Sequence, residues 1–158
     1  MAWLKRWWPV LVWAAVISTF STGAFTSENT SRIIVPVLHW LFPGASQHTL
    51  FQMHHVIRKC GHFVEYFILS WLLLRSIRGP NRGIKLAWAL VAIGLVACYA
   101  SLDEFHQMFV PGRGPAVADV LLDTTGGIAA QAIAALVMMW AHLREARREK
   151  PAQNEREL

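Results

Sequence analysis

The segment Lys85–Gly114, KLAWALVAIGLVACYASLDEFHQMFVPGRG, joins a long apolar run to a dense polar cluster, and this contrast predicts the class of fold. No charged residue lies between Lys85 and Asp103. A helix of about 20 residues is about 30 Å long, which is the thickness of the hydrocarbon core of a bilayer. The polar cluster then follows, interleaved with apolar side chains, and comprises Asp103, Glu104, His106, Gln107 and Arg113. The segment therefore predicts a transmembrane helix that ends in a polar site.

The composition of the whole chain supports a membrane protein. Of its 158 residues, 54% are hydrophobic, eight are Trp and only 16% are charged, whereas soluble domains contain about 25% charged residues. The net charge of +5 is explained by membrane topology and does not indicate a nucleic-acid partner.

Four segments are long and apolar enough to be predicted as membrane spans: Trp7–Phe25, His62–Ile77, Ile84–Leu102 and Ala116–Ala141. We therefore expect an all-α, polytopic bundle of four transmembrane helices formed by residues 1–143. Residues 144–158 are predicted to be a charged cytoplasmic tail that is a frayed helix end or disordered. Ser31–Pro43 is too short and too interrupted by proline to span, and is predicted to be interfacial or re-entrant between the first two spans.

The distribution of Lys and Arg predicts the orientation, because cytoplasmic flanks retain basic residues. With the N-terminus inside, four of the 15 basic residues lie outside, namely Arg32, Arg58, Lys59 and Arg113. Both termini are therefore predicted to be cytoplasmic. An alternative is that Lys5-Arg6, the first apolar stretch and Thr22-Gly23-Ala24 form a cleaved signal peptide.

Several histidines lie in the stretch before the second predicted span. Their spacing matches no recognised zinc pattern, so we expect solvated side chains on an exposed loop and not a metal site. They are His39, His48, His54 and His55.

Polar residues recur at the outer ends of the second, third and fourth predicted spans. Lys59, His62 and Glu65 (or Tyr66) share one helical face, and so do Asp119 and Asp123. A carboxylate in mid-bilayer costs about 2.5–3.5 kcal/mol, so these groups should face protein or trapped water. Gly126-Gly127 would allow the close helix approach that such pairing needs. The candidate site residues are Lys59, His62, Glu65, Asp103, Glu104, His106, Gln107, Arg113, Asp119 and Asp123. A purely structural polar network is the alternative.

Three motifs carry a resemblance to a known family. KCGHFVEYFILSWLL (59–73), YASLDEFHQMFVPGRG (99–114) and ADVLLDTTGG (118–127) resemble the VanZ-like family of small bacterial membrane proteins, over residues 51–137. The founding member of that family is linked to low-level resistance to the lipoglycopeptide teicoplanin. The resemblance implies a multi-pass protein of the bacterial cytoplasmic membrane. Many relatives carry Asn at the position of Asp123, which implies a hydrogen-bonding role there.

Two functions of different classes fit these residues. The first is binding of a lipid headgroup or a lipid-linked cell-wall precursor, with Lys59 and Arg113 meeting its phosphate. The second is a membrane-embedded hydrolase or group transferase, because His62 with Glu65 and Asp103 with His106 form i, i+3 pairs that can supply an acid and a base. A divalent cation could lie between such pairs.

Overall fold

The fold is entirely helical over the residues that the computed structural model describes, which are 2–81, 83, 85–110 and 116–154. Five α-helices and one short 3-10 helix occur in the order α1 Ala2–Phe20, η1 Gly23–Phe25, α2 Ser27–Leu41, α3 Gln47–Arg78, α4 Leu86–Gln107 and α5 Val117–Asn154. No strand occurs in this described part, so the predicted all-α class is confirmed.

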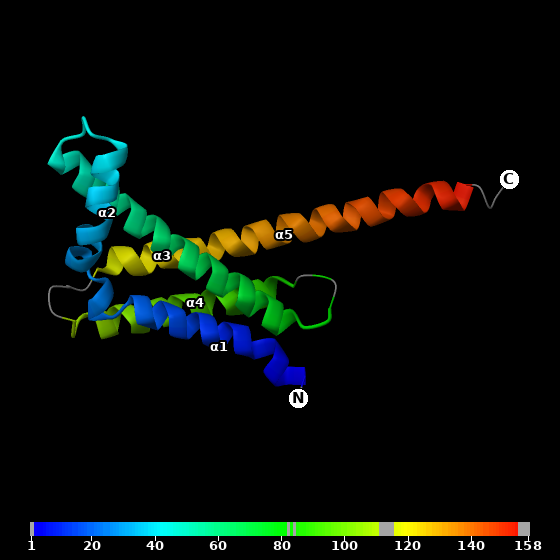
Figure 1. Ribbon diagram of the computed structural model, residues 1–158. Helices are drawn as coiled ribbons and strands as arrows, with labels where there is room; N and C mark the ends of the chain where they lie inside the picture. The colour runs from blue at the N-terminus through cyan, green and yellow to red at the C-terminus, as the bar shows by residue number, and fades with distance from the viewer. Residues whose placement is uncertain (1, 82, 84, 111–115, 155–158) are drawn as a thin grey trace.

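The helices α1, α3, α4 and α5 form the bundle, and their ends define two ends of the molecule (Figure 1). The end of α1, the end of α4 and the start of α5 lie together, and we call this the polar end. The N-terminus, the connection from α3 to α4 and the second half of α5 lie in the opposite direction. We call this the basic end, because it carries Lys5, Arg6, Arg75, Arg78, Lys85, Arg144 and Arg147.

Two helices are long and apolar enough to cross a membrane by themselves. They are α4 and residues 117–147 of α5. The pair formed by α1 and η1–α2 is bent by 62° and would count as a third span, as a broken helix or a re-entrant loop. Helix α3 does not reach the same mean hydropathy, because His62, Glu65 and Arg75 interrupt its apolar stretch. The protein is thus a multi-pass membrane protein with two or three evident spans, and the fourth remains a prediction.

Helix α3 is much longer than its predicted span. It begins at Gln47, where the Ser46 hydroxyl accepts a hydrogen bond from the Thr49 amide at 3.1 Å. No proline and no turn signal follows before Gly79, so the helix continues through the predicted histidine loop. The expectation of an exposed loop was therefore wrong for residues 47–61. The other boundaries also differ, since α1 ends at Phe20 and α4 continues to Gln107.

The charged tail is helical as far as the structure describes it. Helix α5 continues through Asn154, so residues 144–154 are helical in the structure. An apolar stripe no longer requires the helix here, and the strong helix formers Arg, Glu, Lys and Ala account for its continuation.

Helix α1 is part of the core. Val10 is 7% exposed, Ile17 is fully buried, and both pack in one cluster with Tyr66, Leu69 and Val96. A hydrogen bond also joins α1 to α3, since the Trp13 indole Nε1 donates to the Glu65 backbone carbonyl oxygen at 2.8 Å. Helix α1 is thus held in the bundle by both apolar packing and a hydrogen bond.

Two glycines set the distance between α5 and its neighbours. A Cβ atom on Gly126 would lie 2.5 Å from the Phe63 carbonyl oxygen of α3, and one on Gly127 would lie 2.9 Å from Cγ1 of Val96 on α4. Any side chain at these positions would push the helices apart. The predicted close approach at Gly126-Gly127 is therefore confirmed, and it brings the polar faces of α3 and α5 into contact.

Candidate functional site

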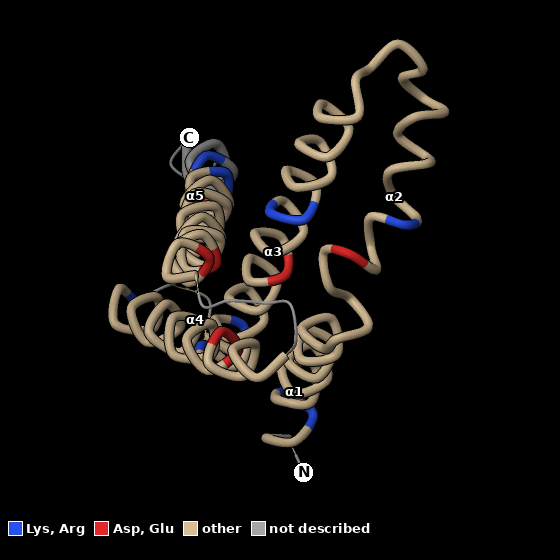
Figure 2. The backbone as a smooth tube through the Cα atoms, turned by 90° about the vertical axis from the view of Figure 1, so that its left-hand side faces the viewer, with Lys and Arg blue, Asp and Glu red and all other residues tan. Residues whose placement is uncertain are grey.

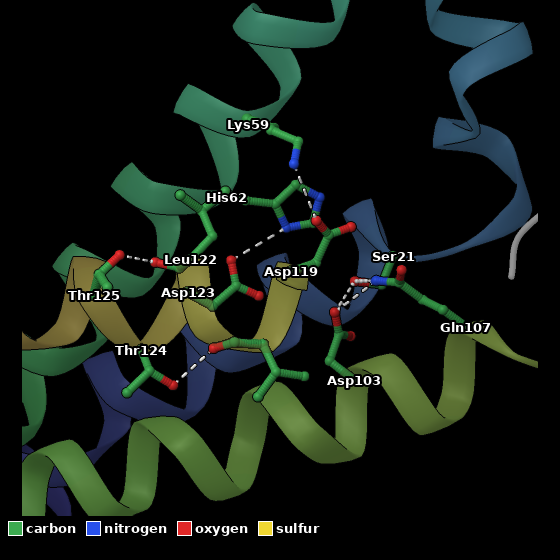
Figure 3. Close-up of polar contacts among 11 residues, drawn as sticks. Ser21, Lys59, His62, Asp103, Gln107, Asp119, Leu122, Asp123, Thr124 and Thr125 are labelled. Carbon is green, nitrogen blue, oxygen red and sulfur yellow. Dashed lines mark hydrogen bonds and ion pairs between the residues drawn. The ribbon is translucent and has the colours of Figure 1, made fainter. Parts of the chain in front are cut away.

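The polar end brings together side chains from α1, α3, α4 and α5. Figure 2 views the molecule from this end, with acidic positions on α3, α4 and α5. The close-up in Figure 3 shows that Lys59 and His62 of α3 point toward Asp119 and Asp123 of α5.

Two side-chain pairs, which we call the rungs, connect α3 to α5. Lys59 Nζ lies 3.6 Å from Asp119 Oδ1, and His62 Nδ1 lies 3.7 Å from Asp123 Oδ1. The first pair is half-exposed, whereas the Asp123 side chain is only 5% exposed. Because the members are spaced by three residues on α3 and by four on α5, the rungs stack along the contact. The pairing expected from sequence between the two helices is present.

A separate hydrogen-bonded group connects α4 to the end of α1. Asp103 Oδ2 accepts from the Ser21 hydroxyl at 2.7 Å and from Gln107 Nε2 at 2.8 Å, and all three side chains are buried (Figure 3). Hydrogen bonds to a carboxylate are about twice as strong as neutral ones. Asp103 thus fastens α1 to α4, and no pattern in the sequence indicates that Ser21 is its partner.

The remaining candidates of the α4–α5 region have different environments. Glu104 Oε1 accepts from the Ala116 backbone amide, which ties the end of α4 to the start of α5. The His106 side chain is exposed, and its imidazole makes no hydrogen bond or ion pair with the described residues. The structure therefore does not bring Asp103 and His106 to one point. Arg113 lies outside the described residues.

A cavity of about 280 Å³ lies beside the α3–α5 rungs, on the face of α3 that looks toward η1 and α2. Its polar wall consists of Thr30, Arg58, His62 and Glu65, and its apolar wall includes Phe20 and Phe25. His62 and Glu65 thus share one cavity, as their i, i+3 spacing predicts.

Arg58 is the cavity residue that sequence reasoning did not select. Its Nη1 donates to the Phe25 carbonyl oxygen at 2.9 Å and to the Thr30 hydroxyl at 3.1 Å. A sequence pattern could have identified Arg58 as a site residue, because Arg58, His62 and Glu65 are spaced i, i+4, i+7 and lie on one face of a helix. Lys59, which we selected, lies one position further around the helix and faces α5.

His54 is buried, contrary to the expectation that the four histidines are solvated. It is 2% exposed, and its Nε2 lies 3.1 Å from the same Thr30 hydroxyl. Burial, with Arg58 and His55 nearby, lowers the pKa of His54. His39, His48 and His55 are exposed as expected.

Polar groups also continue along the contact between α3 and α5, further from the polar end than the rungs. The Ser70 hydroxyl donates to the Gly127 carbonyl oxygen at 2.9 Å, and Gln131 Nε2 donates to the Ser70 hydroxyl at 2.8 Å. The Tyr66 hydroxyl and Asp123 Oδ1 are buried without a hydrogen-bond partner among the described residues. Tyr66 lies one helical turn after His62, and it adds a donor that the sequence suggested only as an alternative to Glu65.

A metal site is not formed by the described residues, since no three His, Cys, Asp or Glu side chains are placed to hold one ion there. The pairs that are present suit hydrogen bonding and charge pairing.

A family model described as VanZ/LLP1 matches residues 7–138, which is most of the chain and covers at least part of every helix of the bundle. No curated protein and no solved structure matches the chain.

Proposed function

The chain belongs to the VanZ/LLP1 family, and from the polar end of its bundle we propose that it binds the headgroup of an envelope lipid or lipid-linked cell-wall precursor. Binding takes place at the outer surface of the bacterial cytoplasmic membrane. Residues 1–143 form the membrane domain, with α1, the 62–77 part of α3, α4 and α5 as four spans, and residues 144–158 form a cytoplasmic tail.

The cavity beside α3 is the observation that carries this proposal. Its 280 Å³ is slightly below the range of about 300–1,000 Å³ for small-molecule pockets, so it suits a headgroup and not a whole lipid. Phe20 and Phe25 form an apolar wall, and Arg58, His62 and Glu65 form a polar one. A ligand that is polar at one side and joined to hydrocarbon at the other matches this division.

The charges of the cavity indicate which headgroup groups bind where. Arg58 supplies a planar guanidinium, which recognises phosphate through two parallel hydrogen bonds. Glu65 accepts hydrogen bonds from hydroxyl or amide groups of a sugar or peptide, and His62 donates or accepts. Lys59, half-exposed beside Asp119, gives a second cation at the rim.

The carboxylates of the two rungs and the Asp103 group support the cavity and need not touch ligand. The rungs hold α5 against α3, and the Asp103 group holds the end of α1 against α4. Lys59, His62 and Glu65, with Arg58 added, therefore form a binding group, and Asp103, Gln107, Asp119 and Asp123 form a positioning group.

Lipid retention tests the proposal directly. The purified full-length protein should retain an anionic envelope lipid, detected by native mass spectrometry, and Arg58→Gln should lower that retention at least about tenfold. A tenfold change corresponds to about 1.4 kcal/mol, which is at the lower limit for a hydrogen bond to a charged group. The matched control is Arg32→Gln, because Arg32 is an exposed arginine of α2 outside the cavity.

Equal retention by the two variants, with melting temperatures like that of the wild type, would contradict the proposal. Conversion of the lipid to a product that requires His62 and Glu65 would instead support the hydrolase or transferase alternative. Cells that produce the wild type, and not Arg58→Gln, should show reduced susceptibility to teicoplanin if the cavity underlies glycopeptide resistance.

A further inference from the structure

A second and larger cavity lies at the basic end of the molecule, where the connection from α3 to α4 faces the second half of α5. Its volume is about 900 Å³. Arg78, Asn81, His142 and Glu145 contribute polar groups to it, and Ala135 and Met138 contribute apolar surface. None of these residues belongs to the site at the polar end.

The described residues provide the Arg78 guanidinium with only a weak hydrogen-bond acceptor. Its Nη1 donates to the thioether sulfur of Met138 at 3.0 Å, and a thioether is a weak acceptor. Among the described residues, this sulfur is the only acceptor that the guanidinium meets. A group with five N–H donors and a full positive charge is thus held at a cavity wall with little to neutralise it.

The turn that follows α3 holds Arg78 in place. Gly79 has a positive φ of 60° and ends the helix, and Asn81 Nδ2 donates to the Arg78 carbonyl oxygen at 2.7 Å. The arginine therefore projects from a defined turn at the end of a helix.

The charge of this end favours an anion. Its described side chains include the seven Lys and Arg residues that define the basic end, against one carboxylate, Glu145. Lys85 lies over the Trp88 ring at 5.1 Å, and Arg144 lies over the Trp140 ring at 3.5 Å. Tryptophan beside a basic residue is typical of the depth at which lipid headgroups lie.

We propose that this cavity binds an anionic phospholipid whose headgroup carries hydroxyl groups, with Arg78 holding the phosphate and Glu145 accepting a hydrogen bond from a headgroup hydroxyl. Ala135 and Met138 contact the upper part of an acyl chain. The lipid belongs to the leaflet opposite to the polar end, so the inference is independent of the function proposed above.

A binding titration with a short-chain phosphatidylglycerol tests this inference on the full-length protein in detergent, with native mass spectrometry as the readout. Arg78→Gln should raise the apparent Kd at least about tenfold, which corresponds to about 1.4 kcal/mol. Arg147→Gln, which removes an exposed arginine of the same end, should change it less than about twofold. Phosphatidylcholine of the same chain length should bind weakly to all variants.

Three outcomes would overturn the inference. Equal weakening by Arg78→Gln and Arg147→Gln would show general charge attraction without a site. Binding of glycerol phosphate as tight as that of the lipid would show that the ligand is a soluble phosphate ester. If Arg78→Gln accumulates poorly, Arg78→Lys keeps the charge and loses the planar fork, and wild-type affinity in that variant would also refute the assignment.

Discussion

Substitution of Gly126 by alanine tests whether close packing of α3 on α5 holds the polar end together. The new Cβ would lie 2.5 Å from the Phe63 carbonyl oxygen, whereas ordinary contacts begin near 3.4 Å. The helices must therefore separate locally by about 0.9 Å, because a backbone oxygen cannot rotate away. Overpacking of this kind costs about 1–3 kcal/mol.

Gly94→Ala is the matched control for this substitution. Gly94 also lies within a helix, and a Cβ there would meet nothing within 4 Å. Both variants gain helix propensity of about 0.8–1 kcal/mol, so the difference between them isolates the cost of overpacking. We expect Gly126→Ala to be less stable than Gly94→Ala by about 1–3 kcal/mol, measured by unfolding of the detergent-solubilised protein.

The same displacement should reach the site. The His62–Asp123 rung lies one helical turn from Gly126, and the Lys59–Asp119 rung lies two turns away. The nitrogen and oxygen atoms within these pairs are 3.7 and 3.6 Å apart, and a further 0.9 Å would exceed the range of an ion pair. Gly126→Ala should therefore also lower lipid retention. Equal stability of the two alanine variants would refute the close contact between α3 and α5.

Further experiments test the Asp103 group, the burial of His54 and the orientation of the protein in the membrane. Asp103→Ala should lower the free energy of unfolding by about 2–4 kcal/mol, since two buried donors lose their acceptor. Asp103→Asn should lower it by only about 1 kcal/mol, because the amide oxygen still accepts a hydrogen bond. Similar melting temperatures of the two variants would contradict the role of this group. Because the pKa of His54 is lower in the folded state than its ordinary value of 6.5, the unfolded chain gains this proton before the folded protein does as the pH falls below about 6.5. The melting temperature should therefore decrease below that pH and not above it, and His54→Gln should remove the decrease. A reporter that is active only outside the membrane should be silent after Leu158 and active in the loop before Gln47, and the reverse would invert the proposed orientation.

The helical class and the pairing of charged residues near the start of α5 could be predicted from sequence because both follow from local patterns. Apolar length indicates α4 and α5, and i, i+3 or i+4 spacing indicates the faces that carry His62 and Asp123. Gly126-Gly127 predicts a close helix approach without indicating its partner, and the structure places Gly126 against α3 and Gly127 against α4.

The contacts with α1 and α2 could not be predicted in the same way. Ser21 binds Asp103 from 82 residues away, and Thr30 binds Arg58 from 28 residues away, and no local pattern pairs a hydroxyl with a distant partner. The polar composition of the histidine stretch predicts a loop, yet tertiary packing of His54 against Thr30 stabilises a helix there. Charge at the end of an apolar run similarly predicts the end of a helix, although α4 continues through Gln107.

The packing of α1 has a consequence for the order of assembly during synthesis. Its backbone carbonyls accept hydrogen bonds from Ser76 at 2.8 Å and from Tyr99 at 2.7 Å, and Ser21, just after its end, donates to Asp103. The ribosome makes α1 first, and its partners on α3, Glu65 and Ser76, follow before those on α4. The chain must be extended beyond residue 103 before Tyr99 and Asp103 are both present. The first helix to be made is consequently among the last to complete its contacts, and premature termination before Tyr99 would leave α1 held by α3 alone.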